Sequence, residues 1–373
     1  MCTNENNALW LTRKHGSFEV GSAPRAQPAS GEIVVRARAV AVNPFERLIR
    51  TVGDIITPWL KYPAILGSDV AGEVIALGKD VSRFKIGDRV AGFAAGAEKG
   101  RRAAEGAFQE EVVLQARMTT PIPDSIGNEE AAVLPLAIAT AAAGLFQQDF
   151  LALQPPAGAT VSRHETLLVW GGSTSVGCNA IQLAVSAGYE VIATASPRNY
   201  DFLKRLGARA VFDRNDPEVV TALIRELAEQ RTCGAIAIGV GSTKSCIDVL
   251  SASVGNRFIA IASPPVSLDQ VRAVKGHWRT LIPVLMRLAI ANVRLVFRAR
   301  RNRVRMKFIW GGSPLNNEVG PMIFEDFLPS ALAEERYVAA PGAIIVGQGL
   351  GAIPDALELQ RKGVSAAKLV VTI

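Results

Sequence analysis

Cysteine and histidine are scarce in this chain of 373 residues, which contains four cysteines and three histidines. The cysteines lie far apart, at positions 2, 178, 233 and 246, and the chain has neither a CxxC nor an HExxH motif. Such spacing does not fit a disulfide framework or a closed structural zinc site. We therefore expect no metal site.

Signals for secretion and for membrane insertion are also lacking. The N-terminal residues MCTNENN are polar and are not followed by the apolar run of a secretory signal. The most apolar stretch, Leu281–Phe297, is interrupted by proline, asparagine and arginine at Pro283, Arg287, Asn292 and Arg294. A spanning helix needs ~20 mostly apolar residues. The sequence predicts a cytoplasmic protein without a transmembrane segment.

The pattern along the chain changes near Pro135. Before it, short strand-like segments such as Ile33–Val42 and Val70–Leu77 are separated by Gly, Pro and Asp, which indicates a β-rich domain. After it, short apolar strands such as Leu167–Trp170 and Glu190–Thr194 alternate with helix-compatible segments. That alternation predicts βαβ units and a parallel sheet. A length of 373 residues fits two domains.

A glycine-containing loop follows the predicted strand Leu167–Trp170 and leads into a predicted helix. Two glycines occupy the first and last positions of a GxGxxG spacing, with threonine in the middle place. A tight strand–helix turn that binds no ligand would have the same pattern. Dinucleotide binding is favoured because a predicted strand precedes the loop, a predicted helix follows it, and a second predicted strand lies at the expected distance. The predicted cofactor-binding residues here are Gly172, Ser173, Thr174, Ser175, Val176 and Gly177.

The residues that follow the predicted strand Glu190–Thr194 indicate whether the cofactor is NADPH or NADH. An acid there would bind the ribose 2′-OH of NADH, but no acid occurs until Asp201. A hydroxyl and two arginines can instead hold a 2′-phosphate. The sequence therefore predicts NADPH, with its 2′-phosphate held by Ser196, Arg198 and Arg214.

Several segments together resemble the medium-chain dehydrogenase/reductase superfamily. They are Gly67–Val74, Val81–Val90, Leu134–Ala141 and the glycine loop. The resemblance covers nearly the whole chain and implies an α/β fold with two domains. A GroES-like β-rich catalytic domain is expected at residues 1–134 and 312–373. A Rossmann domain with a doubly wound parallel sheet is expected at 135–311, with a basic insertion near 270–305.

The chain departs from the zinc alcohol dehydrogenases of that superfamily. Those enzymes place a cysteine after the early strand and a histidine in a Gly-His-Glu segment, where this chain has Val42-Asn43-Pro44 and Gly67-Ser68-Asp69. The zinc-free quinone and enoyl reductases are the closer resemblance. The segments Ala195–Asn199 and Gly347–Ser365 look like the trans-acting enoyl reductases of fungal polyketide pathways, which use NADPH.

That resemblance also implies the remaining site residues. Thr140 would lie near the nicotinamide, and Ser365 would approach the cofactor from the tail. The residues that would contact NADPH are Ser173, Thr174, Ser175, Val176, Ser196, Pro197, Arg198, Asn199 and Arg214. Relatives often carry a lysine or tyrosine where this chain has Phe45-Glu46-Arg47-Leu48, so no proton donor is carried over. We assign Thr140 as the candidate that stabilises an enolate, with water as the proton source. The residues expected to line the substrate site are Phe45, Arg47, Leu136, Ala137, Ile138 and Ala139.

Seven cationic residues lie within fourteen positions, and their summed charge equals the net charge of the chain, +7. They are Arg294, Arg298, Arg300, Arg301, Arg303, Arg305 and Lys307. A solvated face explains them as well as a docking site for an acyl carrier protein, a synthase or the phosphates of coenzyme A. A third alternative joins them to the apolar Leu281–Val296 as a membrane-surface element. No nucleic-acid-binding module accompanies them.

The function predicted is a zinc-independent, NADPH-dependent reduction of the C=C bond of an α,β-unsaturated acyl or carbonyl substrate. Cofactor chemistry of this kind needs few acid–base side chains, which fits a chain with three histidines. An NADPH quinone oxidoreductase of the same fold is the first alternative. The second is a non-catalytic NADPH-binding scaffold or partner protein. Both a monomer and a homodimer remain open.

Overall fold

A computed structural model describes residues 6–156, 161–271 and 278–373. The chain divides into two compact units that alternate along the sequence. Of the described residues, unit 1 comprises 6–136, 271 and 315–373, and unit 2 comprises 137–156, 161–270 and 278–314. The part of the basic insertion at 272–277 lies outside the described residues.

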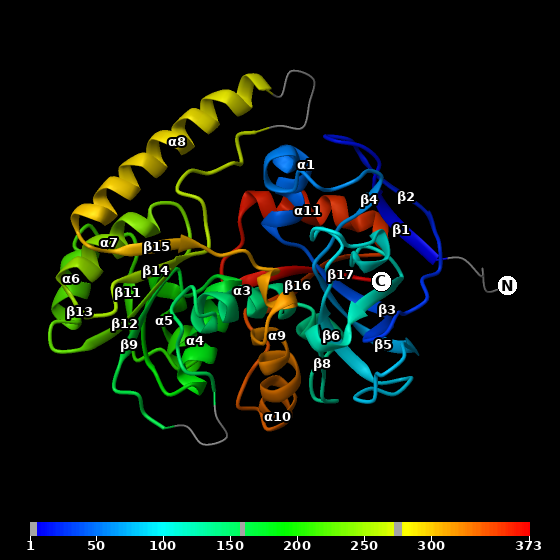
Figure 1. The fold of residues 1–373 in the computed structure, drawn as a ribbon, viewed down its shortest axis with the longest axis horizontal. Helices are drawn as coiled ribbons and strands as arrows, with labels where there is room; N and C mark the ends of the chain where they lie inside the picture. Colours follow the sequence, from blue (N-terminus) through cyan, green and yellow to red (C-terminus); the bar gives the residue numbers. More distant parts are fainter. Residues whose placement is uncertain (1–5, 157–160, 272–277) are drawn as a thin grey trace. The chain divides into compact units, whose positions relative to one another are not determined.

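Unit 1 is built on a seven-stranded sheet with the order β16-β17-β3-β5-β6-β8, in which β7 also pairs with β3. All pairs are antiparallel except β16 with β17. Figure 1 shows the tail strand β17, in red, beside β3, in blue. The strands are β3 (Glu32–Ala41), β5 (Asp69–Leu77), β6 (Arg89–Phe93), β7 (Glu111–Gln115), β8 (Thr119–Pro121), β16 (Gly342–Gln348) and β17 (Ala367–Thr372).

A second, three-stranded sheet of unit 1 has the order β2-β1-β4. Its strands are β1 (Asn6–Leu11), β2 (Phe18–Ala23) and β4 (Ala64–Ile65). Buried apolar side chains from both sheets form one core with the helix α11. The helical segments of unit 1 are α1 (Pro44–Ile56), α2 (Asn128–Ala131), α9 (Val319–Pro321), η5 (Met322–Phe327), α10 (Leu328–Ala333) and α11 (Ile353–Lys362), with 3-10 turns at η1 (Ala103–Glu105), η2 (Ala116–Met118) and η6 (Leu350–Ala352).

Helix α1 was not predicted, because sequence reasoning used Asn43-Pro44 only as a departure from the zinc alcohol dehydrogenases. The same residues are a helix start signal. Pro44 occupies the first helical position, where no N–H is needed, and Glu46 accepts the Asn43 N–H at 2.8 Å. The spacing N-x-x-E with proline would have predicted this helix.

Unit 2 contains a parallel sheet with the order β11-β10-β9-β12-β14-β15, and β13 pairs with β12. This is the doubly wound order of a dinucleotide-binding fold, with its switch point between β9 and β12. The predicted α/β fold class is confirmed. The strands are β9 (Thr166–Trp170), β10 (Glu190–Ala195), β11 (Ala210–Asp213), β12 (Arg231–Ala237), β13 (Val254–Gly255), β14 (Phe258–Ile261) and β15 (Arg305–Phe308).

The central strand β9 of unit 2 is mostly apolar, because both faces of a parallel sheet are covered at its centre, whereas the edge strand β15 is mostly exposed. All five residues of β9 are buried. The strand β12 begins at Arg231 and ends at Ala237. The helices are α3 (Pro135–Phe146), which begins in unit 1, then α4 (Ser175–Ser186), α5 (Tyr200–Arg205), α6 (Val219–Glu226), α7 (Ser242–Ala252) and α8 (Trp278–Arg301), with 3-10 turns at η3 (Pro197–Asn199) and η4 (Ser313–Asn316).

Candidate active site

The turn between β9 and α4 is held by hydrogen bonds within the turn and by hydrogen bonds to Thr194 of β10. The Gly171 N–H donates to the Thr194 hydroxyl at 3.1 Å, and the Gly172 N–H donates to the Thr194 carbonyl at 2.9 Å. The Thr174 hydroxyl donates to the Gly171 carbonyl at 2.8 Å and accepts from the Gly177 N–H at 3.1 Å. The turn is therefore preformed, and the buried Thr194 is a positioning residue that sequence reasoning missed.

Close packing explains why both glycines of the loop are glycines. A Cβ on Gly177 would lie 2.3 Å from the Gly171 carbonyl oxygen, and one on Gly172 would lie 2.8 Å from Leu203. The first N–H groups of a helix have no partner within it and carry partial positive charge. The first turn of the twelve-residue α4 thus presents an anion site at the switch point of the sheet.

Two arginines follow neighbouring strands of unit 2. Arg198 lies in the turn after β10, and Arg214 follows β11. The two strands pair in parallel with Ala195 opposite Asp213, and the Arg214 N–H donates to the Ala195 carbonyl at 3.2 Å. Both arginine side chains are exposed. This strand edge can therefore offer two cations to a phosphate.

The turn after β10 is short and rigid. The Ser196 carbonyl accepts the Asn199 N–H at 2.9 Å, and Pro197 fixes the backbone between them. Sequence reasoning did not consider Tyr200, which follows this turn at the start of α5. Burial, and then the negative charge of Asp213, raises the pKa of the Tyr200 phenol. Tyr200 is thus a neutral hydrogen-bonding group beside the predicted phosphate site.

Unit 1 contains a buried polar network that includes Asn43 and Asp69, in the two segments where the sequence departs from the zinc alcohol dehydrogenases. Asp69 is fully buried at the start of β5 and accepts from the Asn43 amide at 2.6 Å and from the Lys368 ammonium at 2.7 Å. Its other oxygen accepts the Leu136 N–H at 2.7 Å. Lys368 also donates to the Val133 carbonyl at 3.1 Å. The aspartate and the lysine thus form a fully hydrogen-bonded buried ion pair.

This network does not suit a divalent cation. Zinc prefers thiolate and imidazole ligands, and this network has an amide, a hydroxyl, carboxylates and an ammonium. Lys368 already neutralises Asp69 and would repel a second cation. Among the residues that the structure describes, no group of three or more His, Cys, Asp or Glu could hold a metal ion.

Glu46 completes the network from α1. Burial, and then the neighbouring Asp69 charge, raises the pKa of Glu46 from 4.5 to about 7. Its oxygens accept from the Asn43 N–H at 2.8 Å and from the Asn43 amide at 3.3 Å. Sequence reasoning noted Glu46 only as part of an unusual segment. The structure makes it a buried carboxyl that titrates near neutral pH.

The other predicted residues are divided between the two units. Phe45, Arg47, Leu136 and Ser365 belong to unit 1. Arg47 is 8% exposed, and its guanidinium contacts the Gln360 side chain at 3.5 Å. Ser365 is exposed. Their assignment to substrate or cofactor stays a prediction.

The predicted residues of α3 that fall in unit 2 differ in exposure. Ala137, Ile138 and Ala139 are at most 2% exposed, so their side chains pack against protein in this structure. Thr140 is half-buried. Of this helical segment, Thr140 is therefore the better placed to meet a ligand, and the lining role of the other three stays a prediction.

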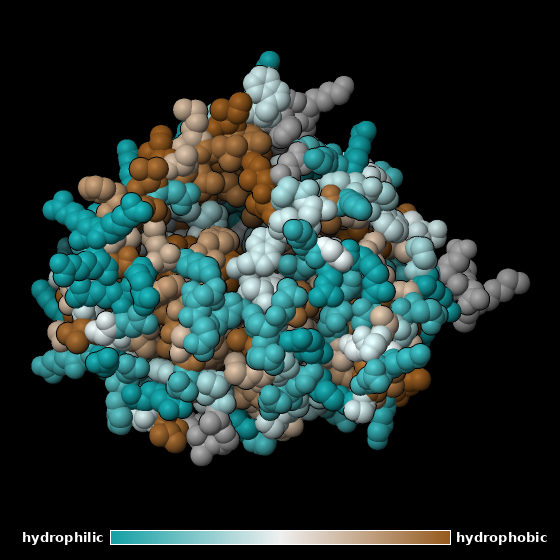
Figure 2. All heavy atoms as spheres, viewed as in Figure 1, coloured by the Kyte–Doolittle hydropathy of each residue, from teal (hydrophilic) through white to brown (hydrophobic). Residues whose placement is uncertain are grey.

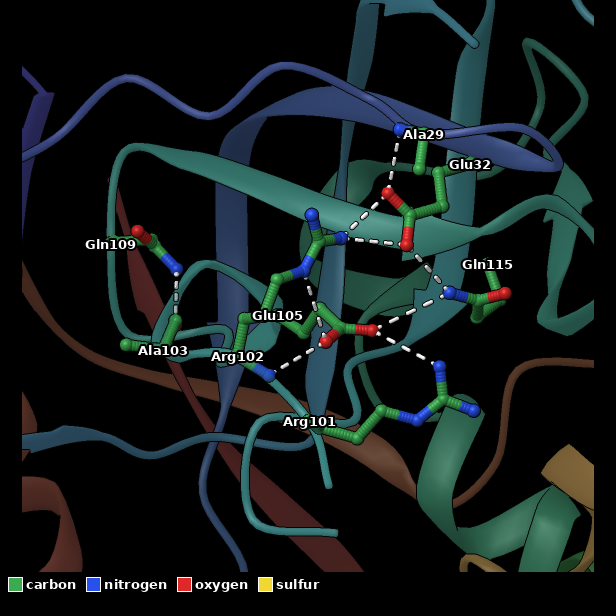
Figure 3. Close-up of polar contacts among 8 residues, drawn as sticks. All are labelled: Ala29, Glu32, Arg101, Arg102, Ala103, Glu105, Gln109 and Gln115. Atoms are coloured by element: carbon green, nitrogen blue, oxygen red, sulfur yellow. Dashed lines mark hydrogen bonds and ion pairs between the residues drawn. The ribbon is translucent and has the colours of Figure 1, made fainter. Parts of the chain in front are cut away.

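A hollow of about 390 Å³ in unit 1 is lined mainly by charged side chains. Figure 3 shows their network: Arg102 donates to both Glu32 oxygens at 2.6 Å, and Arg101 pairs with Glu105 at 3.3 Å. Gln115 donates to Glu32 at 3.0 Å and to Glu105 at 3.4 Å. Ligand sites for apolar molecules are mostly apolar. These ion pairs fasten a loop and do not form a slot for an acyl chain.

The chain is similar to known proteins over nearly its whole length. Residues 29–124 match the alcohol dehydrogenase GroES-like domain. The dehydrogenase pigH of Monascus ruber is 46% identical, with 99% of each chain covered. The trans-enoyl reductase himH of Aspergillus japonicus is 33% identical, with 99% of this chain and 97% of himH covered.

Solved structures of low sequence identity share the fold. The CurK enoyl reductase has a TM-score of 0.70 at 17% identity, with 99% of each chain covered. A mycobacterial protein solved in complex with NADPH has a TM-score of 0.67 at 20% identity, with 99% of this chain and 100% of that chain covered.

The nucleotide-binding sheet, the β-rich unit and the similar dehydrogenases define the class of protein as an oxidoreductase. More narrowly, the chain belongs to the medium-chain dehydrogenase/reductase superfamily, and it resembles the enoyl reductases within it. The predicted family resemblance is confirmed.

Proposed function

We propose that this protein is a zinc-independent, NADPH-dependent, cytoplasmic reductase of the C=C bond in an α,β-unsaturated acyl or carbonyl compound. The observation that carries the proposal is the buried Asn43–Asp69–Lys368 network. Asn43 stands where the resemblance to zinc alcohol dehydrogenases would place a ligand, and here it donates to an aspartate that Lys368 already neutralises. The site therefore does not favour the reaction of a zinc alcohol dehydrogenase, in which zinc polarises the oxygen of an alcohol or ketone. Reduction of a conjugated alkene needs no metal.

The cofactor assignment depends on the residues of unit 2. The first N–H groups of α4 would hold the pyrophosphate, and Ser196, Arg198 and Arg214 would hold the 2′-phosphate. β10 ends in Ala195 and is followed by Ser196, so no carboxylate stands at the position that selects NADH. A solved fold neighbour in complex with NADPH is consistent with this assignment.

NADPH, when bound, supplies a hydride to the β-carbon of the conjugated alkene. The C=C electron pair moves toward the carbonyl, so negative charge develops on its oxygen as an enolate. The Thr140 hydroxyl is the candidate donor that stabilises this oxygen, because it is half-buried on α3. Water then gives a proton to the α-carbon, which completes a saturated product.

An acyl thioester held by a carrier protein is the substrate form we favour, because the relative himH is a trans-enoyl reductase. The Arg294–Lys307 patch would contact the acidic carrier or the phosphates of coenzyme A. Two of its cations are already paired within unit 2, Arg298 with Asp248 at 2.5 Å and Lys307 with Asp149. Of the other cations, Arg300, Arg303 and Arg305 at the C-terminal end of the patch are exposed and would meet the carrier.

A substrate panel tests the proposal. Oxidation of NADPH and of NADH is followed with 2-enoyl thioesters, conjugated enones and simple quinones, each with and without the protein. We expect turnover of enoyl thioesters or enones with NADPH. Turnover of quinones alone would identify a quinone reductase. Tight NADPH binding without turnover of any compound would identify a non-catalytic scaffold, and either result would overturn the proposal.

A further inference from the structure

Helix α8 exposes a continuous apolar stripe. Its members are spaced by four or three residues, which places them on one face of the helix. Figure 2 shows hydrophobic residues gathered over α8. The exposed fractions are 54% for Trp278, 49% for Ile282, 61% for Met286, 49% for Ile290, 70% for Val293 and 69% for Phe297.

The opposite face of α8 holds the helix on unit 2. Val284 and Ala299 are buried, and the helix contacts α7 and β15. Arg298 donates to Asp248 of α7 at 2.6 Å. The stripe is therefore not needed for attachment to the parallel sheet. A run of large apolar side chains left in water normally marks an interaction surface.

A row of arginines borders the stripe. Arg287, Arg294 and Arg301 are seven residues apart, so they lie along one edge of the same helix, and all three are exposed. Arg287 donates to the neutral Gln270 at 3.3 Å, which leaves its charge uncompensated. The sequence contains no Asp or Glu between Asp269 and Glu318. The ionised side chains of α8 itself are therefore all cationic, and three of them border its apolar stripe.

We propose that α8 docks this protein onto the surface of an anionic phospholipid bilayer. Its apolar stripe would enter the boundary between headgroups and acyl chains, and its arginine row would lie at the level of the phosphates. Trp278, at the N-terminal end of the stripe, is of a type enriched at that boundary. An anionic bilayer thus matches both the apolar stripe and the arginine row of α8.

The helix is long and apolar enough to cross a membrane by length and composition, as is the segment Asn128–Phe146, which is mostly buried inside the protein. Crossing is not what we propose for α8. Its inner face is packed on α7 and β15, and Arg287 and Arg294 lie near its middle. A helix that lies in the bilayer surface keeps these contacts and keeps the arginines at the phosphates.

A second copy of this chain is a poorer occupant. Two α8 helices paired through their stripes in antiparallel orientation would bring their arginine rows together. In parallel orientation the arginine row of each helix would lie against Leu285 and Asn292 of the other helix. Because this segment has no acid, neither arrangement neutralises the arginines. An anionic bilayer does neutralise them.

Flotation of the full-length protein with vesicles tests this inference. The vesicles are phosphatidylcholine alone and phosphatidylcholine with phosphatidylserine, at low and at high salt. We expect binding to the anionic vesicles that weakens with salt, and much weaker binding to the neutral ones. Val293→Glu with Phe297→Glu should reduce binding at least tenfold. The matched control, Ile86→Glu with Val254→Glu, changes two equally exposed apolar residues elsewhere and should bind as the wild type does.

The charge contribution is tested separately. Replacing Arg287, Arg294 and Arg301 by Gln should reduce binding to anionic vesicles by on the order of 100-fold at low salt, since each arginine near the surface contributes about fivefold. Replacing three exposed cations elsewhere, Arg225, Lys85 and Lys362, should have little effect. This variant changes only exposed arginines, so it tests the inference even if the glutamate pair disturbs folding.

Three outcomes would overturn the inference. In the first, the wild type does not float with anionic vesicles. In the second, the α8 variants bind vesicles as well as their controls do. In the third, no vesicle binding occurs, and light scattering shows a dimer that Val293→Glu with Phe297→Glu dissociates. The last would assign the stripe to a second copy. Melting temperature and nucleotide binding, measured on every variant, separate these outcomes from a failure of the proposed reductase function, which this inference does not use.

Discussion

At the residue scale, the chemistry of unit 1 depends on how Asp69 is neutralised. A buried carboxylate without partners is very costly, and this one has an ammonium, an amide and a backbone N–H around it. Asn43 and Ser68 could be recognised from the sequence, because they stand where relatives hold zinc. Lys368 could not, because it lies 299 positions from Asp69 and reaches it only through the pairing of β17 with β3.

Thr140→Val tests the predicted enolate donor. Valine keeps the shape of threonine but lacks the hydroxyl, so we expect kcat to fall by about 10²-fold or more, the usual cost of losing one such donor. Thr140→Ser retains a hydroxyl and should recover most of the rate. Equal rates for the valine and serine variants, at unchanged NADPH affinity, would remove Thr140 from the mechanism.

Arg198→Ala tests the assignment of the 2′-phosphate. The guanidinium would interact only with a phosphate that NADH lacks, so Kd for NADPH should rise at least tenfold while Kd for NADH stays unchanged. Lys204→Ala, an exposed cation on the neighbouring α5, is the control. Fluorescence titration measures both constants. An equal loss for the two nucleotides would contradict the assignment.

Glu46→Gln tests the raised carboxyl pKa. The pKa of Glu46 is about 7 in the folded protein and 4.5 when unperturbed, so between these values the folded chain holds a proton that the unfolded chain has lost. The free energy of unfolding should therefore fall by about 3 kcal/mol as the pH rises through that window. Urea titrations across the window should show this slope in the wild type and in the exposed control Glu358→Gln. The slope should be absent in Glu46→Gln.

At the scale of elements, the parallel half of the fold was predictable and several other elements were not. Continuous apolar strands and a glycine loop are local signals, and they indicated β9, β10 and α4 correctly. The exposure of α8 could not be predicted, because an apolar stretch has the same sequence pattern whether protein covers it or not. What covers a helix depends on contacts distant in the sequence.

The loop after β6 provides a prediction at this scale. Arg102 is about half exposed but pairs with Glu32, whose side chain is 8% exposed, and with Glu105, at 3%. Arg102→Ala leaves nearly buried carboxylates short of a donor, so the free energy of unfolding should fall by about 1–3 kcal/mol. Arg336→Ala is the matched control, because Arg336 is equally exposed but its partner Glu334 is 59% exposed. The control should change stability by less than about 1 kcal/mol, and equal effects would contradict a structural role for the cluster.

At the scale of the whole molecule, the order of segments follows from a chain that leaves one compact unit and returns to it. The tail strand β17 pairs with β3 of the N-terminal part. The change from β-rich to alternating sequence near Pro135 indicated only where the first unit is left, and the family resemblance implied that the tail returns to it. The function we propose would use unit 2 for nucleotide binding, and it requires no metal at the Asp69–Lys368 ion pair of unit 1.

The most direct test is the product formed by the metal-free protein. The protein is treated exhaustively with a chelator, its zinc content is measured, and it is incubated with NADPH and a medium-chain 2-enoyl thioester. We predict one equivalent of saturated thioester per NADPH oxidised, detected by mass spectrometry, at a rate unchanged by chelation. Loss of activity with the metal and its return with zinc, or no saturated product from any enoyl substrate, would contradict the account.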